Sequence, residues 1–265
     1  TSKLVRISLD SVDFKENTEY FIFINARTKN EWSLLPKGFE VAKEQLYLAK
    51  KFKLKELQMN KGTALQINNS VKNLQLSSLN MQLVFDKNSG QITSYVYKAK
   101  ELIKNQAGPK INFWRAPTDN DYGYFMPFKL KVWKNGSLNQ TLKNIEIKDF
   151  KSEGVEVKTK YYIPDVKGFV EVKYRVDTNG KINVNICLSE ISNNLPMMPK
   201  FGTNLMIDEN YNNVKWYGRG PHENYQDRNT SSLVGVYESK VSQMYYPYIR
   251  PQENGNRTDT RWASF

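Results

Sequence analysis

Short β-type segments separated by turn residues constrain the fold of this chain more than any other feature. Between Met81 and Phe85 and between Ile92 and Tyr97, strand-forming residues flank a Lys-Asn-Ser-Gly turn, which predicts a β-hairpin. Val155 to Ile163 and Phe169 to Val176 are further segments of this kind. None of the expected segments repeats its apolar residues every 3.6 positions for three turns, as an amphipathic helix would. We therefore predict an all-β fold, a large antiparallel β-sandwich.

The predicted strands fall into two groups. Three of them precede residue 58, at Leu4–Leu9, Glu19–Ala26 and Val41–Phe52. Three strands are too few to close a sandwich, which usually needs about seven. Residues 59–73 are rich in Lys, Gly, Asn and Ser, which is typical of a linker, with one short strand at Ala64–Ile67. Either the three strands join the sheet that follows, or 1–58 is half of a sandwich domain; in both cases the composition shift places a boundary before a second domain, 59–265. Further predicted strands of the second domain are Ile145–Phe150, Ile182–Leu188, Thr203–Ile207, Val214–Tyr217 and Leu233–Tyr237.

The charge and composition of the chain argue against several classes of protein. A net charge of +12 would permit binding to nucleic acid. However, lysines such as Lys158, Lys160 and Lys173 alternate with apolar residues, as on the solvated face of a half-buried sheet, so we predict no nucleic-acid partner. No run of eighteen apolar residues occurs, so we expect no membrane partner, and the lone Cys187 excludes an internal disulfide. We expect a soluble protein and leave its compartment, cytoplasm or periplasm, open.

A polar string at Asp119, Asn120 and Asp121, ending at Gly123, is the first candidate for a functional site. Such a string forms turns and places several oxygen-bearing side chains on one short loop. Calcium loops use similar strings, but they need a bidentate Glu, and none follows within twelve residues. We therefore favour the interpretation that these side chains cap their own backbone.

One four-residue pattern, Pro-x-Glu-Asn, occurs twice near the end of the chain and carries Glu223 and Glu253. Two carboxyl groups on facing loops are what a glycosidase needs, one as acid and one as nucleophile or base. Arginines stand beside both glutamates, and they would instead hold the carboxylates ionised in salt bridges that lock the loops together. We favour the salt-bridge interpretation. His222 precedes Glu223, but adjacent residues in an extended chain point to opposite faces, which argues against an acid/base dyad.

Three long phrases make the chain resemble glycoside hydrolase family 2 β-galactosidases. They are FWRAPTDNDxG at 113–123, WYGRGPHENYxDR at 216–228 and YxRPQENGNR at 248–257. The chain from about Ala64 onward resembles the C-terminal small-chain domain of that family. Residues up to about Leu57 resemble the second half of the immunoglobulin-like domain before it. The resemblance implies a galactose-mutarotase-like β-sandwich preceded by a partial immunoglobulin-like sandwich.

The resemblance also implies where the chemistry lies. In the family, the two catalytic glutamates lie in a (β/α)8 barrel upstream of both domains, and no part of this chain resembles that barrel. We therefore expect a fragment truncated at its C-terminus and inactive alone, from a parent that hydrolyses terminal β-D-galactosides with retention. Its partners would be the barrel and, through the parent, the galactoside, and the parent could form a homo-oligomer. We expect no metal and no cofactor in this chain, and any divalent or monovalent cations of the parent would bind outside it.

We expect loops of this chain to rim the sugar pocket of the parent. The predicted rim residues are Asp119, Asn120, Asp121, Gly123, His222, Glu223, Arg228, Glu253 and Arg257. Gly123 could act as a hinge that lets a mobile loop, Asp119 to Met126, reach the sugar site. The alternative function is a stand-alone carbohydrate-binding or aldose-epimerase-like module, because the aromatic and polar residues of the last fifty positions suit the binding of sugars.

Overall fold

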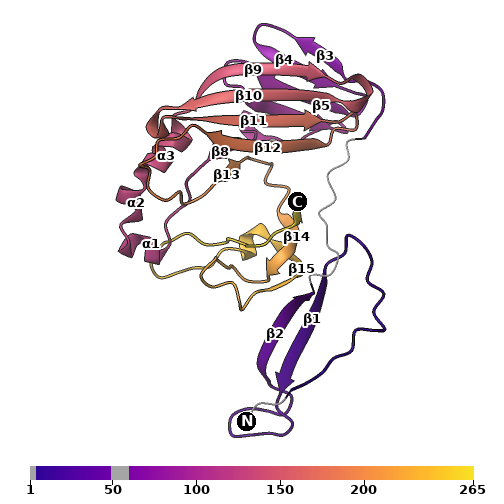
Figure 1. The fold of residues 1–265 in the computed structure, drawn as a ribbon, viewed down its shortest axis with the longest axis vertical. Helices are drawn as coiled ribbons and strands as arrows, with labels where there is room; N and C mark the ends of the chain where they lie inside the picture. Colours follow the sequence, from indigo (N-terminus) through magenta and orange to yellow (C-terminus); the bar gives the residue numbers. More distant parts are fainter. Residues whose placement is uncertain (1–3, 49–59) are drawn as a thin grey trace. The chain divides into compact units, whose positions relative to one another are not determined.

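The computed structural model describes residues 4–48 and 60–265, and the chain divides into two compact units between residues 58 and 59. The first unit contains an antiparallel hairpin of β1 (Tyr20–Arg27) and β2 (Glu40–Leu48), shown in Figure 1. The predicted strand at Glu19–Ala26 is confirmed with a shift of one residue. The predicted strand at Val41–Phe52 is confirmed as far as Leu48, and its remainder lies outside the described residues.

The predicted strand at Leu4–Leu9 is wrong. Residues 4–9 form no strand, and Leu4 and Val5 are 80% and 71% exposed. Alternation of apolar residues stabilises a strand only when one face is covered and the backbone finds a ladder partner. In the described part of the first unit, β1 and β2 pair with each other alone. The immunoglobulin-like identity of this unit stays a prediction.

The core of the second unit lies between two antiparallel sheets (Figure 1). One sheet has the order β3 (Gln66–Asn69), β4 (Asn73–Ser77), β5 (Met81–Asp86), β6 (Ile92–Tyr97) and β7 (Lys100–Glu101). The other has the order β12 (Ile182–Ser189), β11 (Gly168–Val176), β10 (Val155–Ile163) and β9 (Thr141–Asp149). Every second residue of β10 and β11 is buried, as their alternating sequence requires. The rings of Phe85 and Tyr174, one from each sheet, lie 5.3 Å apart, so the antiparallel sandwich and its β5–β6 hairpin are confirmed.

Two smaller sheets complete the second unit. β8 (Lys110–Asn112) pairs with β13 (Gly202–Asn204), and β14 (Asn213–Gly220) lies between β15 (Leu233–Lys240) and β16 (Trp262–Ser264). The two Pro-x-Glu-Asn phrases lie in the loops that follow β14 and β15. Short 3₁₀ turns occur at η1 (Lys104–Gln106), η2 (Lys151–Glu153), η3 (Pro164–Val166) and η4 (Val241–Gln243).

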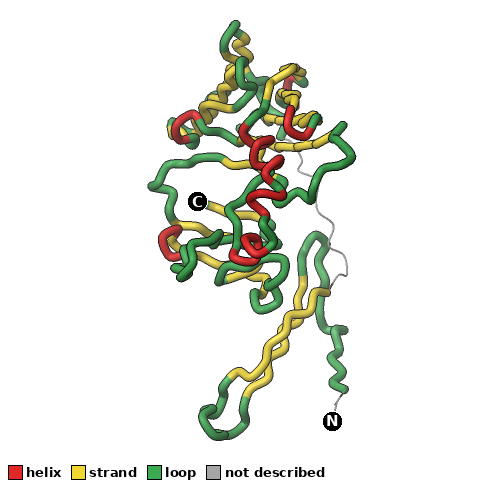
Figure 2. The backbone as a smooth tube through the Cα atoms, turned by 90° about the vertical axis from the view of Figure 1, so that its left-hand side faces the viewer, coloured by secondary structure: helices red, strands yellow, loops and turns green. Residues whose placement is uncertain are grey.

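Three short helices occupy most of residues 119–138, which corrects the prediction of a mobile loop from Asp119 to Met126. Helices α1 (Asp119–Gly123), α2 (Met126–Lys129) and α3 (Lys131–Leu138) follow one another along one side of the unit (Figure 2). Met126, Leu130 and Trp133 are buried and recur at the i, i+4, i+7 spacing of a helix. Because α1 and α2 are only five and four residues long, this pattern never reaches three continuous turns.

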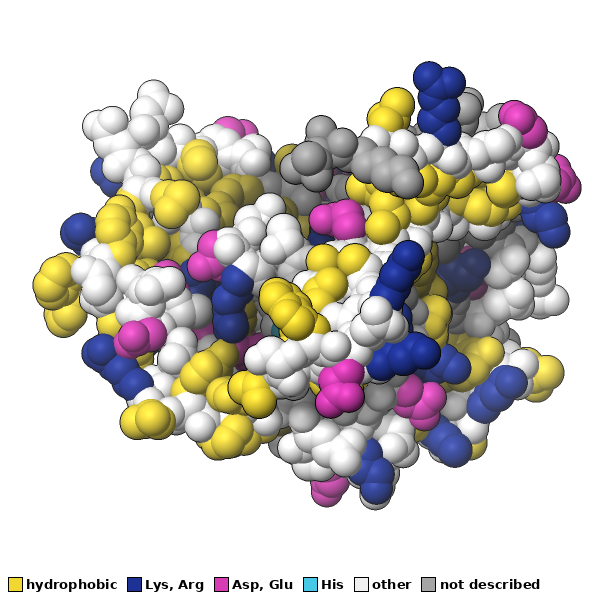
Figure 3. Space-filling model, turned by 90° about the horizontal axis from the view of Figure 1, so that it is seen from below, with side chains coloured by type: hydrophobic (Ala, Val, Ile, Leu, Met, Phe, Trp, Pro, Cys, Tyr) yellow, Lys and Arg dark blue, Asp and Glu magenta, His cyan; other side chains and the backbone are white. Residues whose placement is uncertain are grey.

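Basic side chains are dispersed rather than gathered on the described surface that Figure 3 shows, where acidic and apolar side chains lie between them. On the outer face of the sandwich, the Lys158 ammonium lies 2.7 Å from the Glu171 carboxylate, which fits the predicted solvated face. Among residues 4–48 and 60–265, no helix combines the length and the apolar character that crossing a bilayer requires.

Candidate functional site

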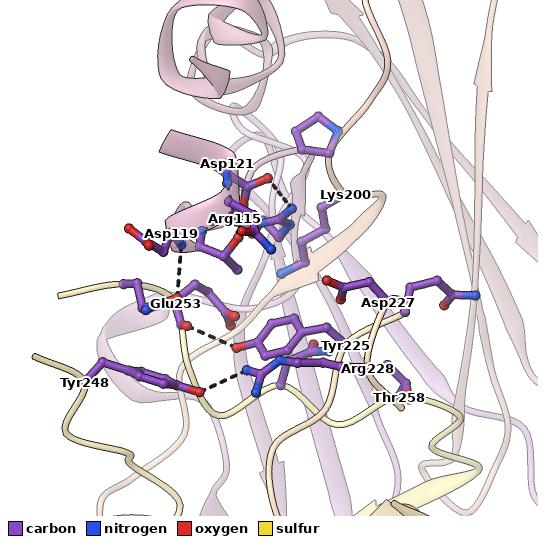
Figure 4. A pocket seen from close by; sticks show the side chains of 16 residues that line it. Arg115, Asp119, Asp121, Lys200, Tyr225, Asp227, Arg228, Tyr248, Glu253 and Thr258 are labelled. Carbon is purple, nitrogen blue, oxygen red and sulfur yellow. Dashed lines mark hydrogen bonds and ion pairs between the residues drawn. The ribbon is translucent and has the colours of Figure 1, made fainter. Parts of the chain in front are cut away.

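A cavity of about 670 Å³ lies in the second unit, where the residues around the start of α1 meet the loops after β14 and β15 (Figure 4). Its walls come from four stretches of chain, 115–121, 199–200, 225–228 and 248–258. Sites for small molecules usually have volumes of about 300 to 1,000 Å³ and a few convergent polar groups. This cavity is therefore the main candidate site of the unit.

A second hollow, of about 590 Å³, adjoins the cavity. The two share Arg115, Lys200, Gln252 and Glu253, so these four side chains form the partition between them. In Figure 4, Lys200 extends toward the space between Arg115, Glu253 and Tyr225. Charged side chains from distant parts of the chain thus converge on one small volume.

Asp121 organises the wall formed by α1. Both of its carboxylate oxygens accept hydrogen bonds from the Arg115 guanidinium, and the carboxylate also accepts one from the Thr118 backbone N–H at 2.7 Å. The Thr118 hydroxyl accepts in turn from the Asp121 backbone, which completes a capping box at the start of α1. Burial opposes ionisation of Asp121, but these donors outweigh it and hold the pKa of the carboxyl below its usual value. The predicted capping role is confirmed for this aspartate.

The start of α1 is joined to the 250–253 stretch by both backbone and side chains. The Glu253 N–H donates to the Pro117 carbonyl at 2.9 Å, and the Asp119 N–H donates to the Gln252 Oε1 at 3.0 Å. The Arg250 guanidinium also lies 2.9 Å from the Asp119 carboxylate. The two stretches therefore form one continuous wall of the cavity.

Glu223 is held in the protein interior by three donors. Its side chain is 8% exposed, and its carboxylate accepts hydrogen bonds from Arg228 at 2.7 Å, from the Gly255 N–H at 2.9 Å and from the Tyr248 hydroxyl. Burial opposes ionisation, but these donors prevail and keep the pKa of Glu223 below its usual value. The predicted salt bridge that locks the two loops is confirmed at this glutamate.

Asn224 adds a second lock between the two Pro-x-Glu-Asn loops. It is completely buried, and its Oδ1 accepts hydrogen bonds from the backbone N–H and the hydroxyl of Thr258. Its backbone N–H donates to the Asn256 carbonyl at 2.9 Å, and the Asn256 side-chain amide donates back to the Asn224 carbonyl at 2.8 Å. The first loop is thus fixed to the second by four hydrogen bonds around one residue.

Glu253 has a different environment from Glu223, and the predicted salt bridge is wrong here. Among the described residues no basic side chain lies within ion-pair distance of Glu253, and its buried Oε2 has no hydrogen-bond partner. Burial raises the pKa of the Glu253 carboxyl above its usual value, and a hydrogen bond with Tyr225 and the positive charge of Arg115 oppose that rise. Glu253 is a lining residue of both the cavity and the adjoining hollow.

The structure brings only part of the predicted rim together. The residues of the predicted set that line the cavity are Asp119, Asn120, Asp121, Arg228 and Glu253. Those that do not line it are Gly123, His222, Glu223 and Arg257. Whether any of them contacts a substrate stays a prediction.

The four residues outside the cavity wall have other surroundings. His222 is exposed, with Nε2 within 3.1 Å of the Ser231 hydroxyl, so it does not face Glu223 as a dyad would. The Arg257 guanidinium lies over the ring of Trp216 and donates to the Pro221 carbonyl. Gly123 is the last residue of α1 rather than part of an extended loop.

Several cavity residues were not predicted. Four of them belong to the three family phrases: Arg115, Tyr225, Tyr248 and Gln252. Their position beside predicted rim residues could have identified them from the sequence. Lys200 lies in none of the phrases, and only the folded chain brings it to the cavity.

No group of three or more His, Cys, Asp or Glu side chains within residues 4–48 and 60–265 is arranged to hold a metal ion. The Asp119–Asp121 string in particular has its charged side chains engaged by arginines.

Comparison with known proteins identifies relatives of the chain. A family model of the β-galactosidase small chain matches residues 77–265. The chain is 31% identical over 249 residues to a β-galactosidase of Priestia megaterium, in an alignment that covers 94% of this chain and 24% of that protein. It is 37% identical over 191 residues to a β-galactosidase of Lactobacillus delbrueckii subsp. bulgaricus, covering 72% of this chain and 18% of that protein. The chain is also 30% identical over 270 residues to a β-galactosidase of Kluyveromyces lactis, in an alignment that covers 96% of this chain and 25% of that protein. The chain thus spans a quarter or less of the length of these relatives.

Proposed function

The chain belongs to the β-galactosidase small-chain family, and from this premise we propose that it is a non-catalytic β-sandwich portion of a larger β-galactosidase. The parent would hydrolyse terminal β-D-galactosides with retention of configuration. This chain would pack on the catalytic barrel of the parent, and its cavity wall would rim the sugar site. The observation that carries the proposal is the match of residues 77–265 to the small chain, together with coverage of at most about a quarter of the relatives.

The two glutamates of the repeated phrase support a non-catalytic role. A retaining glycosidase needs an acid of raised pKa and an ionised nucleophile about 5 to 5.5 Å apart, both facing the sugar. The pKa of Glu253 is raised and that of Glu223 is lowered, so the directions alone would suit such a pair. However, Glu223 is buried away from the cavity and its carboxylate already accepts three hydrogen bonds, so it has no route to a substrate.

Turnover of a nitrophenyl β-D-galactoside by the purified chain tests the proposal. We expect no release of nitrophenol above that in buffer, whereas a full-length family member assayed beside it should be active. Hydrolysis by the chain that disappears in Glu223→Gln or Glu253→Gln would overturn the proposal, because it would reveal a complete catalytic pair within these residues.

A stand-alone sugar-binding module is the second candidate, and one observation favours it. The cavity is formed entirely by residues of the second unit, and its lining includes the rings of Tyr225 and Tyr248. Trp216, in contrast, is 2% exposed and lies beneath Arg257, so it offers no surface for a sugar to stack on. Titration with D-galactose, followed by NMR of the tyrosine resonances, separates the two candidates: a scaffold gives no saturable shift.

A further inference from the structure

Asn-Gly pairs occur at three places in the sequence: Asn135–Gly136, Asn179–Gly180 and Asn254–Gly255. Glycine has no Cβ, so its backbone nitrogen is poorly shielded from the side chain of the preceding residue. Asparagine is labile in such a pair, because attack by this nitrogen on the side-chain carbonyl carbon releases the amide group as ammonia. All three pairs have the same local chemistry, so their surroundings in the folded chain decide which of them reacts.

The pair at Asn254–Gly255 is held at both reacting groups. The Asn254 side chain is partly buried, and its amide donates to the Gln252 carbonyl at 3.2 Å. The Gly255 N–H, which would have to lose its proton, donates to the buried Glu223 carboxylate at 2.9 Å. Reaction at this pair therefore has to break both hydrogen bonds, one of which joins the two Pro-x-Glu-Asn loops.

The pair at Asn135–Gly136 lies inside α3, and the helix holds its backbone. The Asn135 carbonyl accepts from the Asn139 N–H at 2.8 Å, and a Cβ at Gly136 would lie only 3.1 Å from the Ile163 side chain. In a helix the Cα–Cβ bond tilts toward the N-terminus, away from the nitrogen of the next residue. Although Asn135 is exposed, this pair therefore has to unwind part of α3 before it can react.

The pair at Asn179–Gly180 lies in the turn between β11 and β12 and has a free side chain. Asn179 is exposed, and its side-chain amide forms no hydrogen bond within residues 4–48 and 60–265. It also lines a hollow of about 330 Å³, which gives the side chain room to turn. Gly180 is held by its N–H, which donates to the Asp177 carbonyl at 3.1 Å, and by its carbonyl, which accepts from the Tyr95 hydroxyl. Only one of the two reacting groups is thus restrained, and the Asn179 side chain is the part that moves.

We propose that Asn179 is a site of spontaneous deamidation in this chain. The Gly180 nitrogen gives its proton to hydroxide from the solvent and forms a bond to Asn179 Cγ. The bond from Cγ to the side-chain nitrogen breaks, and this nitrogen takes up a proton from water and leaves as ammonia. Water then opens the cyclic imide at either carbonyl carbon, which gives aspartate or its backbone isomer, isoaspartate. The net change is one water taken up and one ammonia lost, without oxidation or reduction.

Either product changes a turn that holds the chain near the start of the second unit. One oxygen of the buried Asp177 carboxyl accepts from the N–H groups of Asn179 at 3.0 Å and Lys181 at 2.8 Å. The other oxygen accepts from the backbone N–H and the side-chain amide of Asn60. Aspartate adds a negative charge two residues from this carboxyl, and isoaspartate lengthens the backbone within the turn. Deamidation therefore loosens the attachment of residue 60, whatever the activity of the parent.

Peptide mapping by mass spectrometry tests the inference on the purified 265-residue chain, incubated at mildly alkaline pH below its unfolding temperature. We expect the mass increase of deamidation and an isoaspartate peptide at Asn179. Rates at Asn135 and Asn254 should be about five- to thirtyfold lower, the factor for opening one or two more hydrogen bonds. A circular dichroism spectrum that stays constant shows that the reaction takes place in the folded chain.

Two controls separate the effect of the fold from that of the sequence. In guanidinium chloride, where the chain is unfolded, the three pairs should react at similar rates. Asn179→Gln should remove the product at this position, because glutamine closes its larger ring far more slowly, and should leave the rates at Asn135 and Asn254 unchanged.

Each contrary result has a definite meaning. Faster reaction at Asn135 or Asn254 than at Asn179 in the folded chain overturns the inference. So does an unmodified Asn179 after a period in which the unfolded chain has reacted completely. Thermal unfolding of Asn179→Asp tests the consequence: a midpoint temperature below that of Asn179→Gln supports the loosening of the turn, and equal midpoints overturn it.

Discussion

The two Pro-x-Glu-Asn loops share a sequence pattern but differ in structure. In the first, Glu223 and Asn224 are buried, and both form hydrogen bonds to the second loop, at Gly255 and Thr258. In the second, Glu253 faces a cavity and has an unpaired oxygen, and Asn254 donates to the carbonyl of Gln252 within its own loop. The difference shows that the surroundings of a side chain, more than its local sequence, decide whether a carboxyl is fully hydrogen-bonded.

Replacing each glutamate by alanine should give the largest contrast. Glu223→Ala leaves Arg228, Tyr248 and the Gly255 N–H without their acceptor, so we expect the free energy of unfolding to fall by about 3 kcal/mol. Glu253→Ala removes a carboxyl that has no ion pair and one unpaired oxygen, and should change the free energy of unfolding by less than about 1 kcal/mol. Urea unfolding curves of both variants measure the difference. Equal losses would contradict the division into a fully bonded and an incompletely bonded glutamate.

The two asparagines sharpen the same comparison on a smaller scale. Asn224→Ala removes the acceptor of two hydrogen bonds from Thr258 in a fully buried position, and we expect a loss of about 2 kcal/mol. Asn254→Ala removes a partly buried amide whose contacts lie close in sequence, so a loss of about 0.5 kcal/mol is expected. Thermal unfolding at one protein concentration measures both. A larger loss at Asn254 would show that the second loop contributes more to the fold than its contacts indicate.

The dependence of stability on pH should differ in sign between the two glutamates. We expect this effect to be smaller than those of the alanine variants of the glutamates and the asparagines. The pKa of Glu223 is lowered in the folded state, so its contribution is present above the usual 4.5 and is lost as the pH falls through the folded value. The pKa of Glu253 is raised, so its contribution is present below 4.5 and is lost as the pH rises through the folded value. Stability profiles from pH 3 to pH 7 should therefore flatten on the acid side in Glu223→Gln and on the neutral side in Glu253→Gln. Each effect amounts to about 1.4 kcal/mol per unit of pKa shift at most.

If Glu223→Gln and Glu253→Gln both flatten the stability profile on the same side, acid or neutral, one of the two carboxyls has the opposite environment to the one described. The comparison between the loops then fails.

The strands of the sandwich could be predicted from the sequence because their signal is local. β10 and β11 alternate buried and half-buried residues along their whole length, and both were predicted to within one residue. Leu4–Leu9 has a similar alternation but finds no sheet partner, which a local pattern cannot reveal. The helices at 119–138 were missed because the buried positions Met126, Leu130 and Trp133 are spread over two short helices and the residue between them.

The candidate site could be predicted only in part, for a physical reason. The phrases that carry Asp121, Arg228 and Glu253 identify residues that reach the cavity, but they do not show which glutamate is buried. That distinction depends on Tyr248 and Gly255, which approach Glu223 from the other loop. Lys200 comes from a connection outside the phrases, and its place at the cavity follows from the folding of the whole unit.

The hydrogen bonds that join Pro117 and Asp119 to the 252–253 stretch have a mechanical consequence. Since α1 begins at these residues, a displacement of α1 would have to break them or carry the Glu253 wall along with it. The helix can therefore swing as an independent lid hinged at Gly123 only if these hydrogen bonds break. A widening of the cavity that keeps these hydrogen bonds requires Lys200 or the 225–228 stretch, on the opposite side, to move away from the joined wall.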